Sequence, residues 1–307
     1  MEDKLLRVPF IKWFIRFFQN IKIPGLEGMS LYDLFELYIP GIIKGALTAR
    51  AGSIAFSFFL ALFPFALFIL TLIPYIPIEG FQEDFTAFIL QSMPSRESAE
   101  AVKKVLFDIA ENKYGELLSF GFILSMFLMT NGVNAIFSGF EYTYHQIETR
   151  TVIRQYMISF MVSLILVFLL LFTVVIIVTI GIILENLEVT GISLDNTFHI
   201  RPIQYFIMIL MVYTAVSILF YFGIKEGKHI SFFSAGSLFT TIFFIINFLI
   251  FSAYINKFGQ YNKLYGSIGT VLVIMLFIWL NSIILLLGFE LNTSLIKLHK
   301  KNISKSN

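Results

Sequence analysis

The sequence predicts an all-α integral membrane protein with six transmembrane helices. Hydrophobic residues make up 57% of its 307 residues and charged residues only 14%, whereas about a quarter of a soluble domain is charged. Six apolar runs reach the length of about 20 residues that a helix needs to cross a bilayer. The runs are too long and too uniformly apolar for membrane strands, whose backbone edges lipid cannot satisfy. A water-soluble fold is therefore excluded.

Six expected spans can be placed along the chain, and the weakest is the second, because Thr130, Asn131 and Asn134 interrupt it. The spans cover residues 51–73, 117–137, 156–184, 203–222, 231–254 and 266–289. Residues 78–116 form the one sizeable connection, in which two apolar stripes at helical spacing predict an extracytoplasmic helical hairpin. We therefore expect a membrane domain over 51–290, preceded by residues 1–50 and followed by a basic tail over 291–307.

The first 50 residues are expected to form helices that do not cross the membrane. Between Pro9 and Asn20 basic and aromatic side chains fall on different sides of a helix, which suits a helix lying in the headgroup plane. Ser30 and Asp33 then have the spacing of a capping box and predict a helix running toward Arg50, bent at Pro40-Gly41.

Composition and motifs argue against several functional classes. The chain has no cysteine, which excludes disulfides, thiolate metal sites and thiol nucleophiles. Its four histidines, at positions 145, 199, 229 and 299, lie in different connections or the tail, so no His-rich metal motif is present. No phosphate loop or nucleophile elbow appears, and a net charge of +2 offers no field that would collect nucleic acid. We expect no cofactor, no metal, no nucleic-acid partner and no catalytic residue.

Polar residues within apolar spans are costly and are therefore the first candidates for function. On the second span Asn131, Asn134, Ser138, Glu141 and His145 fall within about 80° of one another at 100° per residue. They predict a polar wall lining a cavity that opens toward the cytoplasm. Interhelical hydrogen bonding is an equally weighted alternative, because Asn and Ser commonly join spans.

The sixth span carries a second polar face, in which Thr270, Asn281, Gly288 and Asn292 share one side. Asn281 and Asn292 join the candidate cavity residues. Glu290 lies on the opposite side near the end of the helix, where a surface anchor is favoured over a buried carboxylate. Pro64 in the first span is expected to bend its helix.

Four stretches of the chain together resemble the YihY/BrkB family of bacterial inner-membrane proteins. They are the small and aromatic run 51–64 ending in Pro64, the Asn134-x-x-Phe137 pair, the Tyr265-Gly266-x-x-Gly269 motif with Trp279, and the Gly288-x-Glu290-x-Asn292 close of the last span. The loop between spans four and five, 223–228, lacks the proline usual in the family. The resemblance implies a six-helix fold in the bacterial cytoplasmic membrane. Family members have carried a ribonuclease BN label.

Three functions remain open. The favoured one is a permease or lipid translocator with a cavity among spans two, five and six and a lipid or small-molecule substrate. The alternative is a non-transporting scaffold whose partners bind the outer hairpin and the N-terminal helices. A membrane-bound enzyme, including a ribonuclease, ranks third, because RNA hydrolysis needs metal ligands and a basic track.

Topology is the first testable prediction. With both termini in the cytoplasm, 15 of the 22 basic residues lie on the cytoplasmic side, which follows the positive-inside rule. Single cysteines at Ser98 and Ser306 should therefore report opposite sides of the membrane. On intact cells an impermeant thiol reagent should label Ser98→Cys, and labelling of Ser306→Cys alone would reverse the topology.

Overall fold

The computed structural model describes the chain as a set of long helices. The described residues are 19–20, 22, 30–44, 46–72, 81–92, 100, 103, 107, 115–142, 150–189, 196–225, 231–257 and 262–306. Within them the regular elements are all helical. Those helices are α3 (Leu31–Lys44), α4 (Leu47–Leu72), α5 (Phe81–Ser92), α7 (Gly115–Glu141), α8 (Val152–Val189), α9 (Asn196–Gly223), α10 (Ala235–Lys257) and α11 (Asn262–Ser306). The all-α class expected from the sequence is confirmed for this part of the chain.

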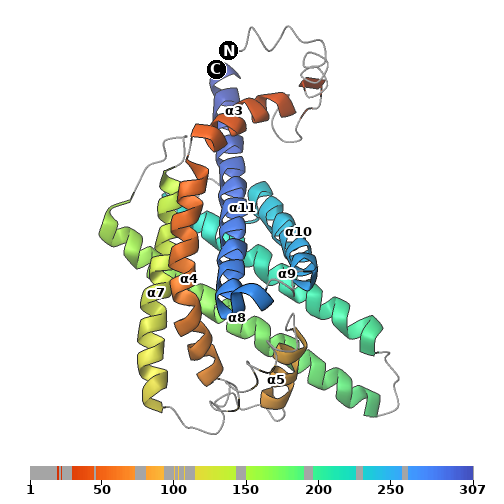
Figure 1. Cartoon of the computed structure of the whole chain (residues 1–307). Coiled ribbons are helices and arrows are strands. Elements are labelled where there is room, and N and C mark those ends of the chain that lie inside the picture. Colours follow the sequence, from red (N-terminus) through yellow and green to blue (C-terminus); the bar gives the residue numbers. More distant parts are fainter. Residues whose placement is uncertain are drawn as a thin grey trace.

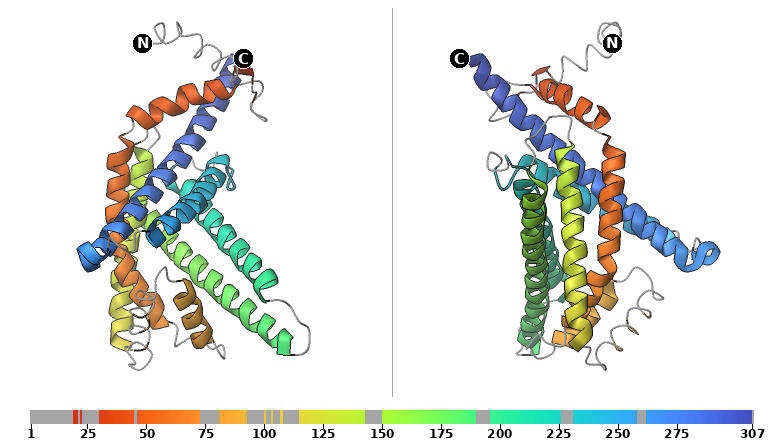
Figure 2. Two further views of the ribbon diagram at one scale, coloured as in Figure 1. Left: turned by 45° about the vertical axis from the view of Figure 1, so that its right-hand side comes forward. Right: turned by 90° about the vertical axis from the view of Figure 1, so that its left-hand side faces the viewer.

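The long helices pack in a closed circuit that mostly follows chain order. Each of α4, α7, α8, α9, α10 and α11 packs against the next, and α11 returns to α4. Figures 1 and 2 show α4 and α7 side by side, α8 and α9 running diagonally away from them, and α3 lying across the C-terminal part of α11. Neighbours in sequence are thus neighbours in space, as short connections require.

Five of the described helices are long and apolar enough to cross a membrane. The spans are Gly121–Glu141, Val152–Gly181, Pro202–Gly223, Ala235–Tyr254 and Val271–Leu298. The expected first span falls in α4, where the apolar stretch that can be assessed, Leu47–Leu62, is shorter. The chain is therefore a multi-pass membrane protein, and the sixth crossing and the orientation remain predictions.

The helix before the first span begins as the sequence predicts. The Ser30 backbone N–H donates to Asp33 Oδ2 at 2.8 Å, and the Asp33 N–H donates to Ser30 Oγ at 3.3 Å. This reciprocal pair is the capping box. The expected helix toward Arg50 is divided in two, because α3 continues through Pro40 and ends at Lys44 and the chain turns at Ala46, whose φ is +46°. Of the expected helix over 9–20, only Gln19 and Asn20 lie within the described residues.

The connection between the first two spans contains one described helix, α5, which packs against α8. Its buried side chains include Phe81 and Phe85, whose rings stack at 6.1 Å. These two phenylalanines belong to the first of the two apolar stripes that predict a helical hairpin over residues 78–116. Of the second expected helix only Glu100, Lys103 and Phe107 lie within the described residues.

The main hydrophobic core lies at one level of the bundle, where α4, α7, α9 and α11 converge. At its centre Phe140 of α7 stacks on Phe289 of α11 with ring centroids 4.0 Å apart, and Phe220 of α9 meets both rings edge-on. Stacked and edge-on aromatic pairs add to the free energy gained by burial. Away from this level large apolar side chains such as Phe168 and Phe206 are exposed, which suits contact with lipid.

Small residues bring α10 and α11 into close contact. A Cβ on Gly288 would collide with Thr240 Oγ1 and the Gly236 carbonyl, and a Cβ on Gly236 would collide with the Gly288 carbonyl. At the same crossing Asn292 Oδ1 accepts from the Gly236 N–H at 2.7 Å, while Asn292 Nδ2 donates to Ser234 Oγ at 2.7 Å. Asn292 therefore caps the first turn of α10 from a neighbouring helix.

Replacing Gly288 with alanine should destabilise the bundle by about 1–3 kcal/mol, the usual cost of forcing extra atoms into a packed site. The matched control is Gly52→Ala, because a Cβ on Gly52 meets nothing within 4 Å. Thermal unfolding in detergent would measure both variants. Equal stability of the two would contradict the close crossing.

Candidate functional site

The polar face of α7 borders a hollow between α4 and α8. The hollow consists of two adjoining cavities, of about 410 and 360 Å³, which share Asn134, Ser138 and Tyr156. The first is also lined by Ser53, Ser57, Leu60, Leu128, Asn131 and Ala135, and the second by Glu141, Tyr142, Arg150, Val152 and Gln155. Four residues that the sequence places on one face thus border one continuous space: Asn131, Asn134, Ser138 and Glu141.

The hollow opens sideways and runs along much of the span. Ser53, Leu60 (45% exposed) and Tyr156 (44% exposed) border it and also reach the outside of the bundle. Asn131 lies ten residues before Glu141, the last residue of its span, which corresponds to about 15 Å along a helix. Since the hydrocarbon core is about 30 Å thick, the polar lining extends from one end of the span to about its middle.

Gln155 of α8 links the polar residues of the second cavity. In one orientation its Nε2 donates to Ser138 Oγ at 3.2 Å. After a half-turn of the amide, Nε2 donates to both Glu141 carboxylate oxygens at 3.0 and 3.1 Å, and Oε1 accepts from Ser138 Oγ at 3.2 Å. The second orientation satisfies both ends of the amide. Sequence reasoning missed Gln155, although it stands at the start of an apolar span.

Arg150 closes the same cavity from the connection before α8. Its guanidinium donates to the carbonyls of Phe222 and Ile224, each at 2.6 Å, at the C-terminal end of α9. Burial is the main cause that lowers the pKa of this guanidinium from its ordinary value, but an arginine stays charged at physiological pH. Only its backbone N–H reaches Glu141, at 3.4 Å. Arg150 therefore mainly caps a helix.

The two remaining candidates lie elsewhere. Asn281 donates to the Phe277 carbonyl of its own helix at 2.8 Å, and Asn292 is the buried cap of α10. Neither borders the hollow. This hollow therefore lies among α4, α7 and α8, whereas the expected cavity lay among the second, fifth and sixth spans.

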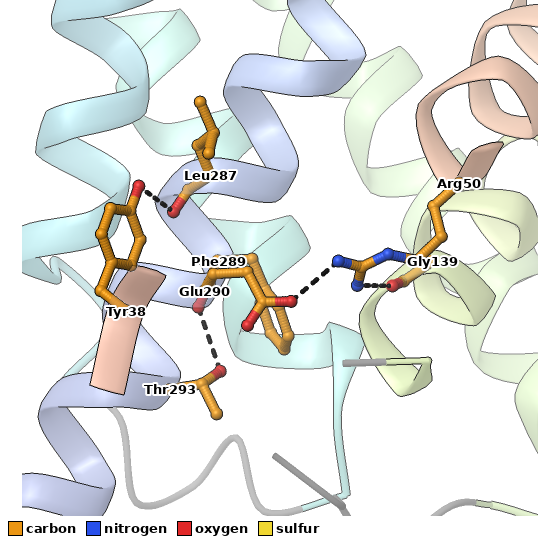
Figure 3. Close-up of polar contacts among 7 residues, drawn as sticks. All are labelled: Tyr38, Arg50, Gly139, Leu287, Phe289, Glu290 and Thr293. Atoms are coloured by element: carbon orange, nitrogen blue, oxygen red, sulfur yellow. Dashed lines mark hydrogen bonds and ion pairs between the residues drawn. The ribbon is translucent and has the colours of Figure 1, made fainter. Parts of the chain in front are cut away.

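A buried ion pair joins α4 and α11 (Figure 3). Arg50 Nη2 lies 2.9 Å from Glu290 Oε1, and the two side chains are 6% and 0% exposed. Arg50 Nη1 donates to the Gly139 carbonyl of α7 at 2.8 Å. The expectation that Glu290 is a surface anchor is wrong, because the neighbouring α3, α4 and α7 cover this level of α11.

Tyr38 of α3 covers the pair from the side. Its hydroxyl donates to the Leu287 carbonyl at 3.1 Å. Burial, and secondarily the Glu290 charge, raises the pKa of Tyr38 to about 12. The phenol therefore stays protonated and remains a donor throughout the physiological range.

Comparison with known proteins decides the family. The family model described as virulence factor BrkB matches residues 42–306. The chain belongs to the BrkB family. A curated relative, the putative ribonuclease-like protein YfkH of Bacillus subtilis (strain 168), is 30% identical over 254 residues, which cover 82% of this chain and 91% of the relative. No solved structure matches.

Several residues that suggested the BrkB family fall at packing positions. Pro64 lies inside α4, and Trp279 packs against the main core. Gly288 lies at the close crossing of α10 and α11, and Glu290 forms the ion pair with Arg50. Tyr265, Gly266 and Gly269 lie in the first turns of α11, but their side chains are outside the described residues.

Within the described residues no group of three or more His, Asp or Glu side chains is placed to hold a metal ion. The polar lining of the hollow consists instead of amides, hydroxyls, the Glu141 carboxylate and the Arg150 guanidinium, which bind polar groups by hydrogen bonds.

Breaking the ion pair should destabilise this BrkB-family protein strongly. Arg50→Met leaves the Glu290 carboxylate buried without its partner, which costs about 3–5 kcal/mol. The double variant Arg50→Met, Glu290→Leu should regain most of that loss, since neither charge remains. Arg154→Met is the control, because Arg154 is exposed on α8. Unfolding in detergent would measure all three, and additive losses in the double variant would contradict the pairing.

Proposed function

We propose that this BrkB-family protein is a permease or lipid translocator of the bacterial cytoplasmic membrane, with the hollow among α4, α7 and α8 as its substrate path. The observation that carries the proposal is a polar lining that opens sideways within a membrane span. Polar groups facing lipid are costly, so such a lining favours a polar occupant.

The shape of the hollow favours an amphipathic substrate. Asn131, Asn134 and Ser138 offer hydrogen-bond partners on the inner wall, while the exposed side chains at the opening include the apolar Leu60. A molecule with a polar head and an apolar tail could place its head on the wall and leave its tail in the bilayer. The polar lining ends near the middle of the span. In the described conformation it would therefore be accessible to lipids of one leaflet.

The proposal is tested by substituting the wall. Asn131→Leu and Asn134→Leu should retain the stability of the fold. Among the described contacts, the Asn131 side chain forms no hydrogen bond to another span, and the Asn134 side chain meets Gln155 alone. The rate of lipid exchange between leaflets, measured with fluorescent lipids in proteoliposomes, should fall at least about tenfold, which corresponds to 1.4 kcal/mol. Asn247→Leu on α10 is the matched control, since its buried Nδ2 has no partner among the described residues.

The same variants separate transport from a scaffold. If the amides are interhelical links, each substitution should cost about 0.6 kcal/mol and up to about 1.7 kcal/mol of stability. A clear stability loss in both variants, with function following the amount of folded protein, would overturn the translocator and support the scaffold.

The name of the Bacillus relative suggests a ribonuclease as another candidate. The four histidines of this chain are spread over distant connections and the tail, which does not suit metal-assisted RNA hydrolysis. We predict that the purified protein does not cleave RNA. Metal-dependent cleavage that co-purifies with the protein and disappears with a point substitution in it would contradict this.

A further inference from the structure

We propose that the Glu141 end of the hollow binds the primary ammonium group of a membrane-lipid headgroup. This inference rests on the proposed function and names its substrate class. The site consists of the Glu141 carboxylate together with the oxygens of Ser138, Asn134 and Gln155, which border one cavity of about 360 Å³.

The Glu141 carboxylate forms no salt bridge with a side chain among the described residues, although the Arg150 charge on the wall of the same cavity acts on it through space. The described ion pair is between Arg50 and Glu290. The Arg150 guanidinium donates to the Phe222 carbonyl of α9 and to the Ile224 carbonyl just after it, and only the Arg150 backbone N–H forms a hydrogen bond to Glu141. A carboxylate at the wall of a cavity, with its neighbouring cation engaged elsewhere, favours an external positive charge.

The surrounding groups suit a donor with several N–H bonds. An ammonium group has three donors and no acceptor, and Glu141, Ser138 and Gln155 can all accept. The Gln155 amide can present either end, because its Oε1 and Nε2 positions lie 3.0–3.2 Å from the Glu141 and Ser138 oxygens. Glu141 is also the last residue of α7, and a helix C-terminus attracts positive charge.

The size and opening of the cavity favour a headgroup over a metal ion. A hard cation needs six or more oxygens converging at about 2.0–2.6 Å, whereas this cavity holds about 360 Å³ and continues into one of about 410 Å³. The continuation opens sideways past Tyr156 and Leu60. A lipid headgroup fits a roomy site that opens toward the bilayer.

Native mass spectrometry of the purified full chain tests the proposal with three lipids of identical acyl chains. Phosphatidylethanolamine should bind about tenfold more tightly than phosphatidylcholine or phosphatidylglycerol, the ratio expected for one charge-assisted hydrogen bond. Glu141→Gln should remove this preference without changing thermal stability. Glu83→Gln, the same change at an exposed position on α5, should retain it.

Equal binding of the three lipids by the native chain, or an unchanged preference in Glu141→Gln, would overturn the ammonium site. Binding of free ethanolamine as tight as that of the lipid would overturn the lipid source. If the three lipids bind equally and Asn131→Leu weakens them all, the inference fails while the proposed path stands. If Asn131→Leu changes neither lipid binding nor lipid exchange, the proposed function fails as well.

Discussion

The arrangement of this bundle depends on one buried ion pair, between Arg50 near the start of α4 and Glu290 within α11. The desolvation cost of such a pair offsets most of its attraction, and Arg50 Nε has no hydrogen-bond partner among the described residues. The pair therefore adds little to net stability. Its effect is selective. An arrangement that separates α4 from α11 takes the buried Arg50 and Glu290 charges away from each other, and one that separates α4 from α7 removes the Arg50 hydrogen bond to the Gly139 carbonyl.

The hollow is a consequence of that arrangement. α7 turns Val133, Ile136 and Phe137 toward the main core, and the ion pair holds α4 along the same helix. At 100° per residue the face that carries Asn134 and Ser138 then points away from the core. It meets α8, where Gln155 and Tyr156 complete the polar border. One helix thus separates the packed core from the candidate substrate path.

Local features were predictable from the sequence, and distant pairings were not. Apolar length and helical period are properties of neighbouring residues. They predict the helical class, most span positions, the Ser30–Asp33 cap and the face shared by Asn131, Asn134, Ser138 and Glu141. The partners of that face depend on packing, so Asn281 and Asn292 were grouped with the wrong helices. Arg50 and Glu290 are 240 residues apart. The signal in the sequence for this pairing is that Arg50 and Glu290, which carry opposite charges, lie at the same end of the expected first and last spans.

The central claim is that water reaches the middle of the α7 span along its polar face. The chain contains no cysteine, so single cysteines report directly. Asn131→Cys should react with a charged, water-soluble thiol reagent in proteoliposomes, whereas Val133→Cys, which lies two residues away and faces the core, should not. Protection of Asn131→Cys equal to that of Val133→Cys would show a dry interface and contradict the account.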